Sequence, residues 1–367
     1  MTAAPLPLAV IGASGFVGLR TVELLSARAD FAVVPVVRSA ASLAVLARQR
    51  LDWRIAGFLD EAALATALRG CAVCIHAAIG DAAQIVRMAE VAYRACAAAG
   101  VRRLVWLSSA SVHGQDCAPG TTEDSPLHTR HPLAYNNAKV RAEHALRRLA
   151  RDRRVEIVLL RPGVVFGPRS RWLADAAADL RAGRAAWLDH GRGVCNSIYI
   201  DNLVEAIRLA ATAPAAAGEA FLVGDAETVV WADFLQPIAR HLGYTETAFR
   251  EVSPPRIVAQ RESRWAAFTL TPAYGRLGAL APDRAKRLVK ALAAAWRPPA
   301  PVPAIWTWRA APPPPPSLTT ELALLQQCRW KLPHAKAARL LGYQPPVPFA
   351  EGLRRSLAWL DFAGLGS

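Results

Sequence analysis

The chain has 367 residues, of which 53% are hydrophobic and 20% charged, and its formal net charge is +15 at pH 7. This length allows one large domain or two modest ones, and no apolar run reaches the roughly 20 residues that a membrane-spanning helix needs. The arginines are scattered and form no compact basic and aromatic module, which argues against nucleic-acid binding. The chain starts without a basic signal-peptide segment, and its six cysteines suggest no disulfide framework. We therefore predict a cytoplasmic protein with no metal site.

Short apolar segments alternate with alanine-rich, helix-like segments through the first half of the chain. Strands are predicted at residues 8–11, 31–37, 73–75, 103–107 and 156–160, and helices at 16–27, 81–99 and 134–150. This alternation predicts an α/β fold, a doubly wound parallel sheet of the Rossmann type with helices on both faces. We assign residues 1–165 to this dinucleotide-binding domain.

After Pro162 the alternation loosens, which predicts a smaller, mostly helical substrate-binding region over residues 166–367. Helices are expected at 172–182 and 203–211, and the apolar segment 220–223 is a candidate strand that could rejoin the sheet. Residues 253–316 differ in kind because they are rich in proline, basic residues and tryptophan. The part at 282–308 could contact a membrane surface or cover a substrate, but a plain insertion is the favoured interpretation.

A glycine-rich loop lies directly between the first predicted strand and the first predicted helix. Glycines there allow a tight turn and a close approach to a pyrophosphate, which then lies at the helix N-terminus. The position after the second strand holds Arg38, and an arginine there can pair with a 2′-phosphate, so NADP is favoured slightly over NAD. We predict cofactor contacts from Arg38 and from the loop residues Gly12, Ser14, Gly15, Phe16, Val17 and Gly18.

Tyr135 and Lys139 form a second motif, on the predicted helix 134–150. Lys139 is the only lysine in the first 285 residues, where every other such basic residue is an arginine. A lysine at this position therefore suggests a role that an arginine could not fill. Residues four apart share one face of a helix, which brings the ammonium near the phenol. A nearby cation lowers the pKa of a tyrosine, and such a tyrosine can exchange a proton with a substrate hydroxyl.

The GxxGxxG spacing of residues 12–18, together with YxxxK at 135–139, resembles the short-chain dehydrogenase/reductases. More narrowly, the chain resembles their extended branch, the NAD(P)-dependent epimerase/dehydratase family, over most of its length and least over 253–316. The resemblance implies that Ser109 polarises the substrate oxygen, Tyr135 moves the proton and Lys139 holds the nicotinamide ribose. Ser111 is the alternative serine. The family commonly forms dimers, so a homodimer is expected.

The same resemblance implies further cofactor contacts. His76-Ala77-Ala78 is similar to the strand-end motif beside the cofactor, which points to Ala77 and Ala78. The segment 161–168 is similar to the RPxxVYGP loop of the family, which points to Pro162. The usual Gly-Asp pair near the adenine is missing, and Asp60 is the candidate substitute.

The sequence is compatible with two classes of enzyme that act on different substrates. Sugar-nucleotide epimerases or ketoreductases are favoured slightly, although Val164 and Cys195 stand where those enzymes often place a diphosphate-binding asparagine and arginine. Dehydrogenases of apolar alcohols, of the 3β-hydroxysteroid or dihydroflavonol type, are the alternative. Ala110-Ser111 replaces the acidic pair of the dehydratases, which disfavours dehydration.

A third possibility is that the protein is not an enzyme and serves as a dinucleotide sensor or scaffold. The candidate substrate contacts are Ser111, Val164, Arg169, Arg171 and Asn196.

Overall fold

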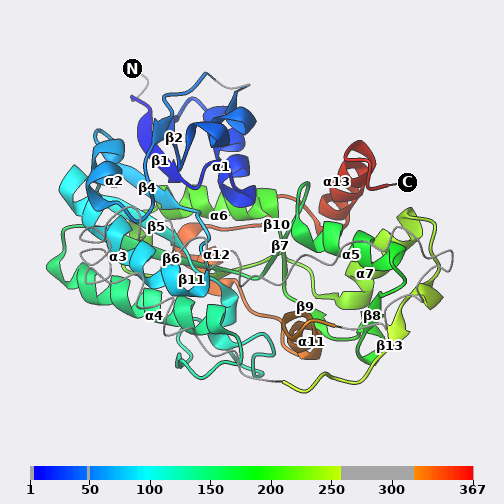
Figure 1. The fold of residues 1–367 in the computed structure, drawn as a ribbon. Helices are drawn as coiled ribbons and strands as arrows, with labels where there is room; N and C mark the ends of the chain where they lie inside the picture. The colour runs from blue at the N-terminus through cyan, green and yellow to red at the C-terminus, as the bar shows by residue number, and fades with distance from the viewer. Residues whose placement is uncertain (1–3, 48–49, 258–317, 367) are drawn as a thin grey trace, which may run out of the picture.

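The structure, a computed structural model, describes residues 4–47, 50–257 and 318–366 (Figure 1). Its centre is one seven-stranded sheet in the order β11-β6-β5-β4-β1-β2-β3, in which every neighbouring pair is parallel. The strands are β1 (Leu6–Ile11), β2 (Phe31–Val37), β3 (Arg54–Ile55), β4 (Val73–His76), β5 (Arg103–Leu107), β6 (Glu156–Pro162) and β11 (Ala220–Val223). The predicted doubly wound parallel sheet is confirmed, and residues 220–223 do rejoin it beside β6.

Helices cover both faces of this sheet, because successive side chains of a buried strand point to opposite sides. In β1, Leu8 and Val10 pack into one core and Ala9 and Ile11 into the other. The helices on the first side are α1 (Phe16–Ser26), α6 (Ile200–Thr212) and α12 (Ala335–Leu341), and those on the second are α2 (Glu61–Leu68), α3 (Ala82–Ala99) and α4 (Ala134–Leu149) (Figure 1). We call this three-layer unit the sheet lobe.

A second group of elements, which we call the C-terminal lobe, lies beside the sheet lobe (Figure 1). Its helices are α5 (Arg171–Arg181), α7 (Trp231–His241), α11 (Thr320–Gln327) and α13 (Phe349–Phe362). Its strands form three pairs: β7 (Val164–Phe166) with β10 (Ser197–Tyr199), β8 (Ala186–Trp187) with β13 (Arg250–Glu251), and β9 (Val194–Cys195) with β12 (Val229–Val230). Phe166 lies at the centre of the core, 5.5 Å from Phe234 and 5.3 Å from Phe349 between ring centroids.

The C-terminal half of the chain therefore differs from the expectation in two ways. It contains short strand pairs as well as helices, and α6, β11 and α12 pack on the sheet although they follow residue 165 in the chain. The domain boundary at 165 stays a prediction, as does the homodimer. Residues 258–316, which include the segment 282–308, lie outside the described residues. Within the described part, no helix has the length and hydropathy to cross a membrane.

Candidate active site

The loop between β1 and α1 comes very close to neighbouring backbone. Gly12 has a φ of 82°, and a Cβ atom there would lie 2.7 Å from the backbone nitrogen of Ala78, just after β4. A Cβ atom on Gly18 would lie 2.1 Å from the carbonyl oxygen of Gly12. Glycine is required at both positions. Among the described residues no side chain caps α1 at Gly15, so the first N–H groups of this helix are available to a phosphate.

These features fit a dinucleotide at the carboxyl edge of the sheet. The order of the strands reverses between β1 and β4, and ligands of open α/β sheets bind at such a switch point. The predicted loop residues 12–18 and Ala77-Ala78 meet there, as the close approach of Gly12 to Ala78 shows. When bound, the pyrophosphate would lie against the N-terminus of α1 and the loop backbone.

Arg38 and Asp60, the two predicted contacts on the adenosine side, differ in how they are engaged. Arg38 is exposed and its guanidinium carbon lies 5.7 Å from the ring centroid of Phe58, without a carboxylate partner among the described residues. Asp60 is exposed, and its Oδ1 accepts a 3.0 Å hydrogen bond from the backbone nitrogen of Ala63 at the start of α2. The role of Asp60 as the N-cap of α2 accounts for its presence without a bound ligand. The guanidinium of Arg38, by contrast, is available to bind an anion.

The three side chains predicted to carry out catalysis meet between β5 and α4. Ser109 follows β5 and accepts a 2.9 Å hydrogen bond from the hydroxyl of Ser111. Tyr135, in the first turn of α4, lies close enough to Ser109 for that hydroxyl to lower its pKa. One turn later, the Nζ of Lys139 donates a 2.7 Å hydrogen bond to the carbonyl oxygen of Leu107 and lies 5.6 Å from the centroid of the Tyr135 ring. This geometry is compatible with proton exchange at a substrate oxygen beside Ser109.

The pKa values at this site differ from the expectation that Lys139 lowers the pKa of Tyr135. Burial raises the pKa of Tyr135 to about 12, and the hydrogen bond with Ser109 opposes this rise only in part. Burial also lowers the pKa of Lys139 to about 8, against the favourable charge of Glu143. Helical spacing predicted the proximity of the two side chains correctly, but it carries no information about desolvation, which dominates both groups.

A buried polar network lies behind the catalytic candidates. Glu143 and Arg161 are 0% and 1% exposed, and the guanidinium reaches both carboxylate oxygens at 3.0 and 2.7 Å. The same carboxylate accepts a 2.6 Å hydrogen bond from the hydroxyl of Ser108, next to Ser109. Burial alone would raise the pKa of Glu143, but Arg161 holds it below its usual value. The network anchors α4 to the ends of β5 and β6.

His76, the last residue of β4, is a buried histidine. It is 1% exposed, and neither ring nitrogen has a hydrogen-bond partner among the described residues; the same is true of the indole nitrogen of Trp106. The two rings lie 4.4 Å apart, and the Nζ of Lys139 is 5.2 Å from the Trp106 ring. Burial, with the nearby charge of Lys139, lowers the pKa of His76 to about 3. A neutral aromatic pair therefore lies beside the Lys139 ammonium.

The predicted substrate residues are brought together only in part. Ser111 contacts Ser109, and Val164 is buried in the core of the C-terminal lobe. Arg169 and Arg171 are exposed and form ion pairs with Glu23 and Glu321 at 3.5 and 2.9 Å. The amide of Asn196 bonds to backbone atoms of Trp330 and Leu332. Cys195, in the position of the expected phosphate-binding arginine, is 0% exposed.

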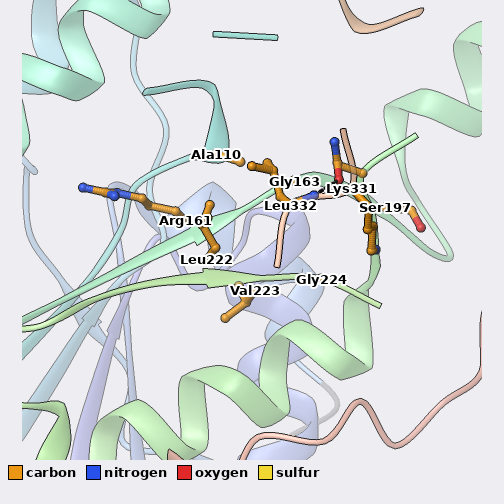
Figure 2. A pocket seen from close by; sticks show the side chains of 10 residues that line it. Ala110, Arg161, Gly163, Ser197, Leu222, Val223, Gly224, Lys331 and Leu332 are labelled. Carbon is orange, nitrogen blue, oxygen red and sulfur yellow. Dashed lines mark hydrogen bonds between the residues drawn. The ribbon is translucent and has the colours of Figure 1, made fainter. Parts of the chain in front are cut away.

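The sequence analysis did not find Lys331, which reaches a small pocket next to Ala110 (Figure 2). The pocket is bordered by Gly163 after β6, by Asn196 and Ser197, and by the end of β11. Its lysine comes from a segment more than 100 residues beyond these neighbours, so no local spacing could have indicated it. The only available signal was the rarity of lysine in this chain.

Comparisons with known proteins agree with a dinucleotide-binding fold. A family described as NAD(P)H-binding matches residues 12–171. A UDP-glucose 4-epimerase of Vibrio cholerae is 28% identical over 257 residues, which cover 64% of this chain and 75% of the relative. A dTDP-glucose 4,6-dehydratase of Streptomyces venezuelae, solved with NAD, has the same fold with a TM-score of 0.68 and 20% identity, over 97% of both chains. The chain therefore carries an NAD(P)H-binding domain, and it shares its fold with dehydratases and epimerases of sugar nucleotides.

The similar proteins are named as epimerases, dehydratases and dehydrogenases, and the expectation of an NAD(P)-binding enzyme is confirmed at that level. A plant relative, the 3β-hydroxysteroid-dehydrogenase/decarboxylase isoform 2 of Arabidopsis thaliana, is 23% identical over 339 residues. The match covers 87% of this chain but 53% of that protein, so this chain spans about half the length of the plant relative. Both substrate types considered from the sequence therefore occur among the similar proteins by name.

Proposed function

We propose that this chain is a dehydrogenase or ketoreductase that works on a secondary alcohol or ketone with NADP or NAD, using Ser109, Tyr135 and Lys139. The observation that carries this proposal is that the Nζ of Lys139 lies 5.6 Å from the centroid of the Tyr135 ring, one turn along the same helix, and that Tyr135 interacts with Ser109. When bound, the nicotinamide supplies or accepts the hydride. The protein supplies position and a proton.

In the reducing direction, the Ser109 hydroxyl donates a hydrogen bond to the ketone oxygen and Tyr135 gives that oxygen its proton. With its pKa raised to about 12, the phenol keeps this proton at neutral pH and can act as the acid. In the oxidising direction the same proton returns to the phenolate. The Lys139 ammonium, positively charged below its pKa of about 8, is proposed to hold the nicotinamide ribose beside Tyr135.

We further propose that the substrate is a largely apolar molecule and not a sugar nucleotide, which reverses the order favoured by the sequence. A diphosphate needs uncommitted cations, and Arg169, Arg171 and Arg192 are each paired with a carboxylate. Val164 and Cys195 are buried apolar groups at the other two expected positions. The plant hydroxysteroid enzyme among the relatives is consistent with this choice.

A sugar-nucleotide epimerase remains the second candidate, favoured by the identity to the Vibrio cholerae UDP-glucose 4-epimerase. An epimerase regenerates its cofactor within each cycle, whereas a reductase exchanges it. Denaturing the purified protein and identifying the released nucleotide by chromatography separates the two. Tightly retained NAD(H) favours the epimerase, and an empty protein that binds added NADPH favours the reductase.

The catalytic assignment is tested with Tyr135→Phe. We expect hydride transfer, followed at 340 nm on a panel of cyclic ketones and alcohols, to fall about 10²–10⁴-fold, the usual contribution of a general acid. Cofactor binding, followed by nucleotide fluorescence, is expected to persist. Tyr244→Phe, in the C-terminal lobe, is the matched control and should keep full activity. Wild-type turnover in Tyr135→Phe would reject the assignment.

A further inference from the structure

Cys117 and Cys328 are two cysteines that stand 211 positions apart in the sequence and bring their sulfurs to 3.8 Å from each other. Cys117 lies in the loop after the short helix η2 (Ala110–His113), which begins directly after Ser109. Cys328 directly follows α11 of the C-terminal lobe. Both are free thiols. The contact therefore joins the loop that follows the catalytic serine segment to the C-terminal lobe.

The two thiols lie in a small apolar cluster of their own. The cluster also contains Ala110, Leu222 and Leu332, which Figure 2 shows near one another, and Trp330 packs against it. The indole nitrogen of Trp330 donates a 3.1 Å hydrogen bond to the carbonyl oxygen of Thr121, so the same two segments meet a second time. Because Ala110 is the first residue of η2, a covalent change at the thiol pair takes place next to the catalytic serine segment.

The surroundings of the two sulfurs differ. The Sγ of Cys328 lies 3.5 Å from Nδ2 of Asn196, an amide donor. Contact with the thiol of Cys117 lowers the pKa of Cys328, and neighbouring donors support this shift against burial, whereas the same contact and burial both raise the pKa of Cys117. The thiolate, not the thiol, is the nucleophile in cysteine chemistry. Cys328 is therefore the sulfur that reacts first, and Cys117 is placed to react second.

Neither cysteine of this pair lies in a helix or a strand. Cys74 and Cys96 are another pair of neighbouring thiols, but β4 and α3 fix their backbones, and both are 0% exposed. Cys117 is 5% exposed and Cys328 1%, and because their sulfurs are in contact, a small oxidant that reaches one reaches both. A disulfide needs its sulfurs about 2 Å apart. Segments without regular structure can make that approach without loss of helix or sheet hydrogen bonds.

We propose that Cys117 and Cys328 form a reversible redox pair, which hydrogen peroxide converts into one disulfide between the loop after the catalytic serine segment and the C-terminal lobe. The Cys328 thiolate attacks the peroxide and breaks its O–O bond, which gives a sulfenic acid and a hydroxide that takes up a proton as water. The sulfur of Cys117 then attacks the sulfenic sulfur, and its proton leaves with the displaced hydroxide as a second water. The two thiols lose two electrons, which the peroxide gains, and a thiol reductant reverses the bond.

The bond is detected on the full-length protein by counting its thiols. The native protein is treated with hydrogen peroxide, the excess is destroyed with catalase, and the chain is denatured in iodoacetamide and digested for mass spectrometry. Of the six cysteines, we expect two fewer to be alkylated than in the untreated protein. The peptides of Cys117 and Cys328 should appear as one linked species. Dithiothreitol added before alkylation should restore all six thiols.

The bond should also stabilise the fold, because it joins residues 211 positions apart and so restricts the unfolded chain. We expect the oxidised protein to unfold roughly 4 °C above the reduced protein in differential scanning calorimetry. Cys117→Ala and Cys328→Ala should each abolish both the linked species and this rise. Cys96→Ala, which removes one thiol of the other pair, is the matched control and should keep both.

Four results would overturn the proposal: six alkylated cysteines after peroxide treatment, a sulfinic acid on Cys328 without a linked species, a link between Cys74 and Cys96 or between two chains, and a linked Cys117–Cys328 pair without a rise in unfolding temperature. The peptide map is made on the unsubstituted protein, so it decides the proposal even where an alanine variant does not fold. The inference goes beyond the proposed function, and turnover of Tyr135→Phe does not bear on it.

Discussion

The sheet lobe and the C-terminal lobe both bring charged residues toward the active site, but they hold them differently. In the sheet lobe, Glu143 and Arg161 are almost completely buried and bind each other through two short hydrogen bonds. In the C-terminal lobe, Arg171 is exposed and pairs with Glu321, also near the surface, at 2.9 Å. A buried pair that loses one partner leaves an isolated charge in a poorly polar environment, whereas an exposed pair is replaced by water.

This contrast indicates a division of labour. The buried network holds the catalytic serine segment and α4 in one geometry, as positioned proton transfer requires. The arginines on the C-terminal lobe contribute little to this geometry, so that side of the site can change its ligand preference without disturbing the chemistry. Breaking one ion pair in each lobe tests this contrast, and two further variants, at His76 and Arg38, test single residues of the sheet lobe.

Glu143→Gln should show the largest effect. Removing one partner of the buried pair leaves Arg161 uncompensated, and we expect a loss of about 3–5 kcal/mol in the free energy of unfolding, measured by urea denaturation. Glu321→Gln breaks the exposed pair with Arg171 and should cost about 0–1 kcal/mol. Similar losses in the two variants would contradict the distinction between the lobes.

The buried neutral His76 should make the protein sensitive to acid. Its pKa is near 3 in the folded chain against an ordinary 6.5, so between these values unfolding takes up a proton and stability falls as the pH falls. One such group contributes a slope of at most about 1.4 kcal/mol per pH unit. His76→Phe should therefore flatten the dependence of unfolding free energy on pH from 6.5 to 3, whereas His128→Phe, at an exposed position, should not. A slope unchanged by His76→Phe would show that His76 is already protonated or hydrated in the folded protein.

Arg38→Ala should have the smallest effect. It should change only the affinity for NADPH relative to NADH. An exposed guanidinium without a carboxylate partner is available to a 2′-phosphate, so its loss should weaken NADPH binding about tenfold while NADH binding stays nearly constant. Arg28→Ala, whose side chain pairs with Asp30 instead, is the control. Equal weakening of NADPH and NADH would remove the argument for NADP.

The sequence predicted correctly those strands, turns and spacings that are set by residues close together in the chain. The predicted strands 31–37 and 103–107 agree with β2 and β5 to the residue, because their apolar runs are bounded by clear breaks. The glycine loop and the Tyr135–Lys139 spacing likewise depend on a few consecutive residues. By contrast, α7 carries a proline at position 237 inside the helix, and the sequence did not predict it; packing of Trp231, Phe234 and Ile238 in the lobe core supports the helix there.

By itself the sequence determined the alternation of strands and helices, the phosphate-binding turn and the spacing that brings a lysine near a tyrosine, since each is a property of a short segment. Only the tertiary structure decided that desolvation raises the pKa of Tyr135, that Glu143 neutralises Arg161, and that Lys331 meets Ala110 in one pocket. Burial and electrostatic pairing depend on which distant segments fold together. The pattern of residues along the chain does not show how much water folding removes from each ionisable side chain.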